Sequence, residues 1–98
     1  MDFEFDELKK EFLEEAGGKV REIEELVSKN DDPSKQRALY LTHQLKGAGG
    51  SYGFATISSE AASLEADLEA GKNGEAVASR ILKLREVIET RRGELASS

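Results

Sequence analysis

Residues 30–53 read NDDPSKQRALYLTHQLKGAGGSYG and contain the clearest helix start in the chain. Asp32 is suited to cap this helix, and Pro33 suits its first position, where the missing N–H removes no hydrogen bond. Apolar and small residues then recur every three or four positions, which predicts an amphipathic helix over about residues 33–52. The predicted core side of this helix comprises Ala38, Leu41, Thr42, Leu45, Ala48, Gly49 and Tyr52.

The segments on both sides of this helix show the same helical spacing and no alternation of period two. They predict helices over about residues 4–16, 18–29, 56–70 and 74–95. Gly17-Gly18 separates the first two, because each glycine inside a helix costs about 1 kcal/mol relative to alanine. Since the apolar stripe keeps its phase through these glycines, one kinked helix is the alternative. Gly71 is expected to end its helix as a left-handed C-cap.

Short connections between amphipathic helices place neighbouring helices antiparallel. The sequence therefore predicts an all-α protein, an up-and-down antiparallel four-helix bundle with a short extra N-terminal helix. This extra helix is expected to pack across one end of the bundle. The length of 98 residues indicates a single domain over residues 1–98.

Composition restricts the chemistry that this chain can perform. It has no Cys, which excludes disulfides and thiolate metal sites, and its single His argues against an imidazole-rich metal site. The net charge of −6 argues against binding to nucleic acid or to an anionic membrane surface. The acidic N-terminus, MDFE, is unlike a signal peptide, so we expect a cytoplasmic protein.

The acidic residues are distributed unevenly along the chain. Residues 33–59 contain no Asp or Glu, but they contain Lys35, Arg37 and Lys46 and so carry a net charge of +3. The rest of the chain carries −9. The one imidazole, His43, lies inside this positive window, which can receive an anion while the acidic surroundings repel other acidic molecules.

The outward side of the helix over 33–52 is the predicted functional surface. His43 lies on it, away from the core side. Lys46 lies one turn further on, where its charge can neutralise an anion carried by the imidazole. A histidine on a helix surface is otherwise an ordinary residue, so this neighbour is what makes it a candidate site.

Glycines continue the same outward stripe. Gly47 and Gly50 follow His43 at helical spacing, although glycine is disfavoured inside helices. We expect them to give a bulky partner access to the imidazole. Gly49 and Gly53 lie off this stripe, and we expect them to let neighbouring helices pack closely.

The string from His43 to Gly53, HQLKGAGGSYG, resembles the signature of histidine-containing phosphotransfer (HPt) domains of two-component phosphorelays. That signature is H-x-L-K-G, followed by small residues and a Gly ten positions after the His, and this chain matches each part of it. Leu64-Glu65, on the next predicted helix, is also similar to the family's pattern. The helix order agrees with the family over the whole chain.

The resemblance implies a phosphoryl carrier without kinase activity of its own. His43 would accept a phosphoryl group from a receiver-domain aspartyl phosphate or a histidine kinase, and pass it to the receiver Asp of a response regulator. Lys46 would stabilise the charge of the phosphoryl group. The residues expected to contact the partner are Leu39, Gln44, Gly47 and Gly50. The chain is expected to act as a monomer and to bind no cofactor or metal, with Mg²⁺ supplied by the partner receiver domain.

Two alternatives stay open at this point. The phosphotransfer domain of a chemotaxis-type histidine kinase shares H-x-x-K-G and the later Gly, and would be phosphorylated by its own ATP-binding domain. A non-catalytic helical docking module is the alternative from another class, although both His43 and Lys46 are present. Nucleotide binding and Ser-His-Asp hydrolysis are disfavoured, because the glycines continue a helix and no strand precedes them.

Overall fold

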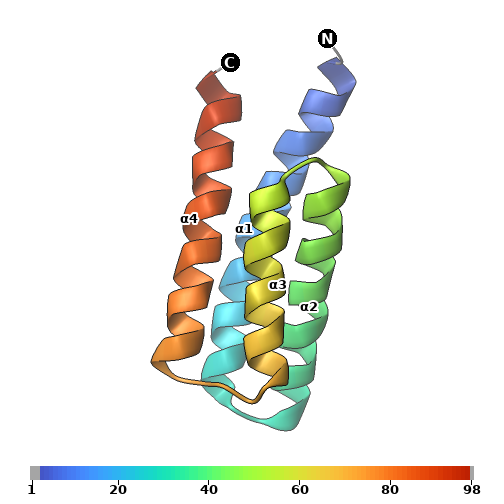
Figure 1. The fold of residues 1–98 in the computed structure, drawn as a ribbon. Helices are drawn as coiled ribbons and strands as arrows, with labels where there is room; N and C mark the ends of the chain where they lie inside the picture. The colour runs from blue at the N-terminus through green and yellow to red at the C-terminus, as the bar shows by residue number, and fades with distance from the viewer. Residues whose placement is uncertain (1–2, 98) are drawn as a thin grey trace.

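The computed structural model describes residues 3–97, which form four α-helices and no strand. The helices are α1 (Phe3–Lys29), α2 (Asp32–Ser51), α3 (Ala55–Glu69) and α4 (Glu75–Ser97). Both α1 and α3 pack against α2 and α4, so each helix has two neighbours in the bundle (Figure 1). This arrangement confirms the expected all-α, up-and-down four-helix bundle. The bounds of α2, α3 and α4 differ from the expected ones by only one or two residues.

The core contains apolar side chains from all four helices, as their spacing predicts. The core side of α2 contributes the buried residues Ala38, Leu41, Thr42, Leu45 and Gly49. Ala48 and Tyr52 are half-buried at its edge. The opposite side of α2 therefore faces outward. None of the described helices is both long and apolar enough to cross a membrane.

α1 is one continuous helix, so the expected separate N-terminal helix over residues 4–16 is not found, and the single-helix alternative describes the chain better. Gly17-Gly18 lies inside α1 and has helical backbone. The buried residues on the two sides of these glycines are Phe12, Leu13, Ala16, Val20 and Ile23. Burying each larger side chain contributes about 1.5–3 kcal/mol, which outweighs the cost of about 1 kcal/mol for each glycine.

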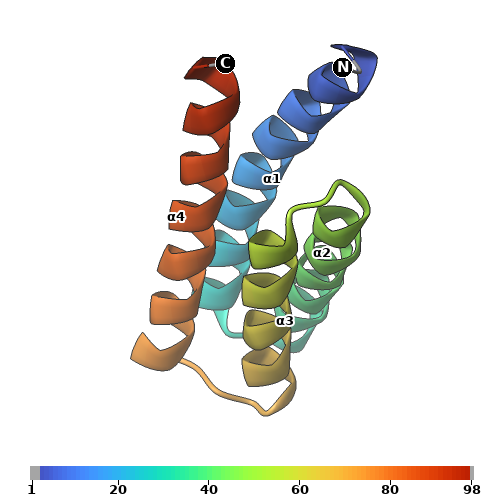
Figure 2. The same ribbon diagram turned by 45° about the horizontal axis from the view of Figure 1, so that its top comes forward.

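The N-terminal half of α1 runs past the α2–α3 turn instead of packing across the end of the bundle (Figure 2). Tyr52 stacks on both Phe5 and Phe12 of α1, with ring centroids 6.1 and 5.0 Å apart. Phe12 also stacks on Phe54, at 5.9 Å. Because Tyr52 follows α2 and Phe54 precedes α3, these rings attach α1 to the turn.

The helix start before α2 differs by one residue from the prediction. Asp31, not Asp32, caps the helix, since its carboxylate accepts a hydrogen bond of 2.8 Å from the Ser34 N–H. This hydrogen bond lowers the pKa of Asp31. α2 begins at Asp32, and Pro33 lies in its first turn, where its missing N–H is not needed.

Two glycines end helices in the left-handed conformation. Gly71 follows α3 with φ of +78°, as expected, and Gly53 follows α2 with φ of +83°. The expected packing role of Gly53 is wrong, because a Cβ on Gly53 would meet nothing within 4 Å. Gly53 instead provides a positive φ that residues with a Cβ rarely adopt.

α2 and α3 approach each other closely at Gly49, in agreement with its expected packing role. A Cβ on Gly49 would lie 3.2 Å from Ile57 Cγ2 and 3.2 Å from the backbone nitrogen of Ser58. The Ser58 hydroxyl also donates a 2.8 Å hydrogen bond to the carbonyl of Lys46. The absence of a side chain at Gly49 therefore permits the short distance between the two helices.

Replacing Gly49 with valine should destabilise the bundle by about 1–3 kcal/mol, because the added methyl groups overpack against α3. The matched control is Gly47→Val on the outward side of α2, where a Cβ would meet nothing within 4 Å. Urea denaturation followed by circular dichroism measures the free energy of unfolding of both variants. Equal losses would contradict the packing role of Gly49.

Candidate functional site

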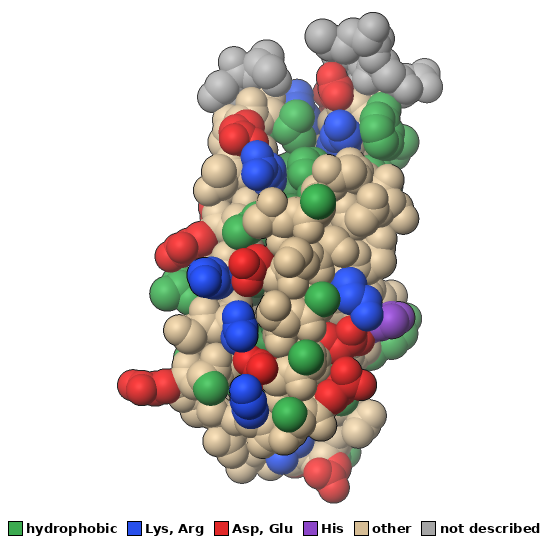
Figure 3. Space-filling view, in the orientation of Figure 1, with side chains coloured by type: hydrophobic (Ala, Val, Ile, Leu, Met, Phe, Trp, Pro, Cys, Tyr) green, Lys and Arg blue, Asp and Glu red, His purple; other side chains and the backbone are tan. Residues whose placement is uncertain are grey.

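His43 projects from the outward side of α2, with 66% of its side chain exposed. The imidazole stands at the edge of the molecule, beside basic and acidic side chains (Figure 3). Gly47 and Gly50 are exposed on the same side, and Lys46 is half-buried next to them. α2 thus brings these four predicted site residues together, as their spacing requires.

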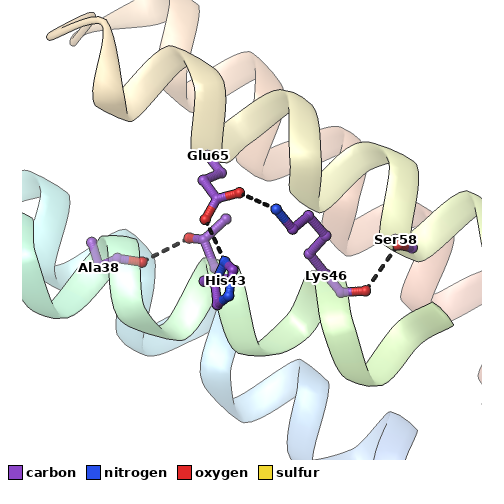
Figure 4. Close-up of polar contacts among 6 residues, drawn as sticks. Ala38, His43, Lys46, Ser58 and Glu65 are labelled. Atoms are coloured by element: carbon purple, nitrogen blue, oxygen red, sulfur yellow. Dashed lines mark hydrogen bonds and ion pairs between the residues drawn. The ribbon is translucent and has the colours of Figure 1, made fainter. Parts of the chain in front are cut away.

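A carboxylate from α3 joins the two polar site residues of α2 (Figure 4). Glu65 Oε2 lies 2.8 Å from His43 Nδ1, and Glu65 Oε1 lies 2.6 Å from Lys46 Nζ. Only 14% of the Glu65 side chain is exposed. Partial exclusion of water strengthens both contacts relative to a fully exposed ion pair.

Glu65 decides which ring nitrogen of His43 carries the hydrogen. The hydrogen bond from Lys46 lowers the pKa of Glu65, burial opposes this effect, and the contact with His43 lowers the pKa further. Glu65 is therefore ionised at neutral pH, and an ionised carboxylate only accepts hydrogen bonds. Nδ1 must carry the hydrogen and donate it to Glu65. In the neutral ring the lone pair is then on Nε2, which has no hydrogen-bond partner among the described residues.

Lys46 is held at both its side chain and its backbone. Glu65 accepts a hydrogen bond from the ammonium, and the Ser58 hydroxyl donates one to the carbonyl. An ammonium group has three N–H donors, so the remaining ones are available to an anion bound at the ring. The positive charge of Lys46 is thereby fixed near His43 before any ligand arrives.

Gly47 has no packing role in the part of the chain that the structure describes. A Cβ on Gly47 would meet nothing within 4 Å, and a Cβ on Gly50 would meet only the Ser58 hydroxyl, at 3.7 Å. The interior of the protein therefore does not require glycine at either position. The access role expected for Gly47 and Gly50 stays a prediction.

Leu39 and Gln44, the other two expected contact residues, are half-buried and lie on different flanks of the outward side. Leu39 lines a small pocket together with Val27 and Leu68. The Gln44 amide donates a 2.9 Å hydrogen bond to the Tyr40 hydroxyl. Neither residue joins the polar group around His43.

The site offers few ligands to a metal ion. Within residues 3–97, no three His, Cys, Asp or Glu side chains cluster in a way that could hold one. The carboxylate nearest the imidazole, Glu65, is already neutralised by Lys46. A divalent cation at this carboxylate would compete with the ammonium for its negative charge.

The family model described as the Hpt domain matches residues 7–94, which is most of the chain. The chain belongs to the Hpt domain family. No curated protein and no solved structure matches it significantly. As an Hpt domain it has a histidine phosphotransfer role in a phosphorelay, and Hpt domains interact with receiver domains and kinases.

Glu65 is the residue of this Hpt domain site to which the sequence assigned no role. The available signal was the match of Leu64-Glu65 to the family pattern. Leu64 is buried on the core stripe of α3 with Ile57 and Ala61, so the next residue lies at the edge of that stripe. Spacing along α3 does not say whether this edge faces α2, which is why the role of Glu65 was missed.

In this Hpt domain, Lys46→Met should raise the pKa of Glu65 towards its usual value near 4.5, because it removes the hydrogen bond that lowers this pKa most. The pH titration of the side-chain carboxyl carbon by NMR measures this shift. Lys35→Met is the control, since it removes a charge from the same positive window without contacting Glu65. A Glu65 titration that is equal in all three proteins would contradict the assigned cause.

The Lys46–Glu65 ion pair should make the stability of the fold depend on pH. The pKa of Glu65 is lower in the folded than in the unfolded protein, so its contacts stabilise the fold fully above about pH 4.5. This stabilisation is lost as the pH falls through the lowered pKa. The difference in unfolding free energy between wild type and Lys46→Met should therefore shrink on acidification. A difference that is constant down to about pH 3 would show that the pair contributes nothing through its charge.

Proposed function

We propose that this Hpt domain is a phosphorelay intermediate in which His43 accepts a phosphoryl group and passes it on. The donor is the aspartyl phosphate of a receiver domain or a histidine kinase, and the acceptor is the receiver Asp of a response regulator. The chain carries the group without kinase activity of its own. A cytoplasmic location and a monomeric state belong to the same proposal.

The observation that carries this proposal is the 2.8 Å contact between His43 Nδ1 and Glu65. It leaves the Nε2 lone pair on the opposite edge of the ring, and 66% of the His43 side chain is exposed. A neutral imidazole nitrogen is a competent nucleophile without a dedicated base. The ring is therefore oriented, accessible and in the reactive tautomer before a partner binds.

In the proposed step, Nε2 attacks the phosphorus of the partner's acyl phosphate in line with the departing aspartyl oxygen. The N–P bond forms while the P–O bond breaks, and the electron pair of that bond leaves with the partner's carboxylate. The imidazole becomes positively charged because Nδ1 keeps its hydrogen, and Glu65 offsets this charge. Transfer to the acceptor Asp reverses these bond changes.

Lys46 supplies a second electrostatic contribution in this proposal. Its ammonium is fixed beside the ring by Glu65, with N–H donors left for the phosphoryl oxygens. Phosphoryl transfer depends mainly on positioning and charge stabilisation, so an exposed helix surface is sufficient. We expect Mg²⁺ on the partner receiver domain to supply the remaining positive charge.

The central test incubates the protein with a radiolabelled, phosphorylated receiver domain. The Hpt protein should acquire a radioactive phosphoryl label that is lost in acid and kept in base. His43 is the only histidine of the chain, so His43→Gln should remove this label completely while circular dichroism stays unchanged. Label that persists in His43→Gln would contradict the assignment of His43 as the phosphoacceptor.

The donor separates the relay from the chemotaxis-type alternative. A relay intermediate is labelled by phosphorylated receiver domains. The chemotaxis-type domain is labelled by ATP together with an ATP-binding kinase domain. Labelling by neither donor would favour the docking-module alternative.

Gly47→Leu should slow phosphoryl transfer about tenfold or more, because the side chain would obstruct the close approach that in-line attack needs. The fold should be unaffected, since a Cβ on Gly47 meets nothing within 4 Å. Gly93→Leu is the matched control, at an exposed position of α4 where a Cβ also meets nothing within 4 Å. A rapid-quench time course measures both rates. If Gly47→Leu transfers the phosphoryl group at the wild-type rate, the access role of Gly47 is refuted.

A further inference from the structure

Tyr40 presents a large aromatic side chain beside the phosphotransfer site. It lies on α2 one turn before His43, and it is 53% exposed. Side chains three residues apart on a helix have Cβ atoms about 5–6 Å apart, so Tyr40 and His43 are neighbours. Arg37 contacts both the Tyr40 ring and Glu22 of α1, which places Tyr40 on the α1 side of His43, whereas Glu65 approaches His43 from α3.

Neighbouring side chains hold the Tyr40 ring in place. The Gln44 amide donates to the phenol oxygen at 2.9 Å, and the Arg37 guanidinium lies 5.4 Å from the ring centroid. Arg37 in turn contacts Glu22 of α1, at 3.5 Å. Contacts between such exposed groups add little to stability. They nevertheless favour the observed orientation of an aromatic ring that the core does not use.

The ordered phenol offers specific chemistry to a partner. Its oxygen accepts the hydrogen bond from Gln44, so its own hydrogen can be donated to an oxygen on another molecule. The exposed part of the ring offers apolar contact area. Tyrosine has few rotatable bonds, and a ring that is already ordered loses little entropy on binding. A matching partner places an apolar side chain on the ring and a carbonyl oxygen at the phenol.

A receiver domain that reaches His43 must also cover Tyr40. A standard interface buries about 800 Å² on each partner, which corresponds to a round patch with a radius of about 16 Å. Tyr40 is one helical turn from the reacting nitrogen and so lies well inside that patch. Aromatic residues near the centre of an interface are frequent carriers of binding energy.

We propose that Tyr40 is an anchor residue for the partner receiver domain and that Gln44 and Arg37 hold it ready. This inference rests on the proposed function and deepens it. Glu65 and Lys46, on the α3 side, prepare His43 for the reaction, while Tyr40, on the α1 side, binds the partner. Gln44, expected to contact the partner itself, becomes a positioning residue for Tyr40.

The test measures the rate of transfer from a phosphorylated receiver domain as a function of its concentration. The receiver used is the one that transfers fastest to the wild-type protein in a panel of purified receiver domains. Tyr40→Ala should raise the half-saturating concentration about tenfold and change the limiting rate by less than about twofold. Tyr40→Phe keeps the ring but cannot donate, and should raise that concentration by about threefold. Leu82→Ala on α4, which removes a side chain of similar exposure at 51%, should change neither value.

A double-mutant cycle tests the role of Gln44. Gln44→Ala should raise the half-saturating concentration when Tyr40 is present and have no further effect in Tyr40→Ala. Equal effects in the two backgrounds would overturn the positioning role and show that Gln44 contacts the partner directly.

Phosphoramidate, a small donor that needs no docking surface, separates the two ways in which the inference can fail. If phosphoramidate labels His43 but no receiver domain either donates the phosphoryl group to it or accepts the group from it, the proposed function falls and this inference with it. If receivers label wild type and Tyr40→Ala with the same half-saturating concentration, the assignment of Tyr40 alone falls. A loss confined to the limiting rate would also overturn it, because an anchor acts on binding.

Discussion

The close approach of α2 and α3 at Gly49 is the constraint on which the site depends. A Cβ there would lie 3.2 Å from backbone and side-chain atoms of α3, so a larger residue would push the two helices apart. Glu65 reaches across this same interface to His43 and Lys46, at 2.8 and 2.6 Å. Hydrogen bonds weaken steeply beyond their normal length, so a separation greater by about 1 Å would disconnect the carboxylate from both.

Under the proposed function, His43 is a nucleophile that serves large partners, and such a residue faces conflicting physical demands. It must be exposed, yet an exposed side chain ordinarily rotates freely and loses entropy when it is fixed. In this bundle Glu65, on a neighbouring helix, orients the exposed His43, and no packing contact requires the glycine that follows on α2. Under the proposed function, one helix would orient the imidazole and the other would leave it open to a partner, so that no enclosed pocket is needed.

The features that could be predicted from the sequence are those settled within one helix. The outward position of His43 and the left-handed Gly71 follow from local spacing and local backbone preference. The predicted helix break at Gly17-Gly18 was wrong because helix propensity is a weak preference. The burial of side chains on both sides of the glycines overrides it. The role of Glu65 could not be predicted, since it depends on the distance between two helices and therefore on the contact at Gly49.

Because Glu65 serves two donors at once, His43 and Lys46 are thermodynamically linked through a single counter-ion. If His43 is phosphorylated as proposed, the positive charge on the ring would increase its attraction for the carboxylate and weaken the hold of Glu65 on Lys46. The loaded and unloaded forms would then differ in the electrostatic surface around one histidine, a difference that partners could recognise without any change of fold.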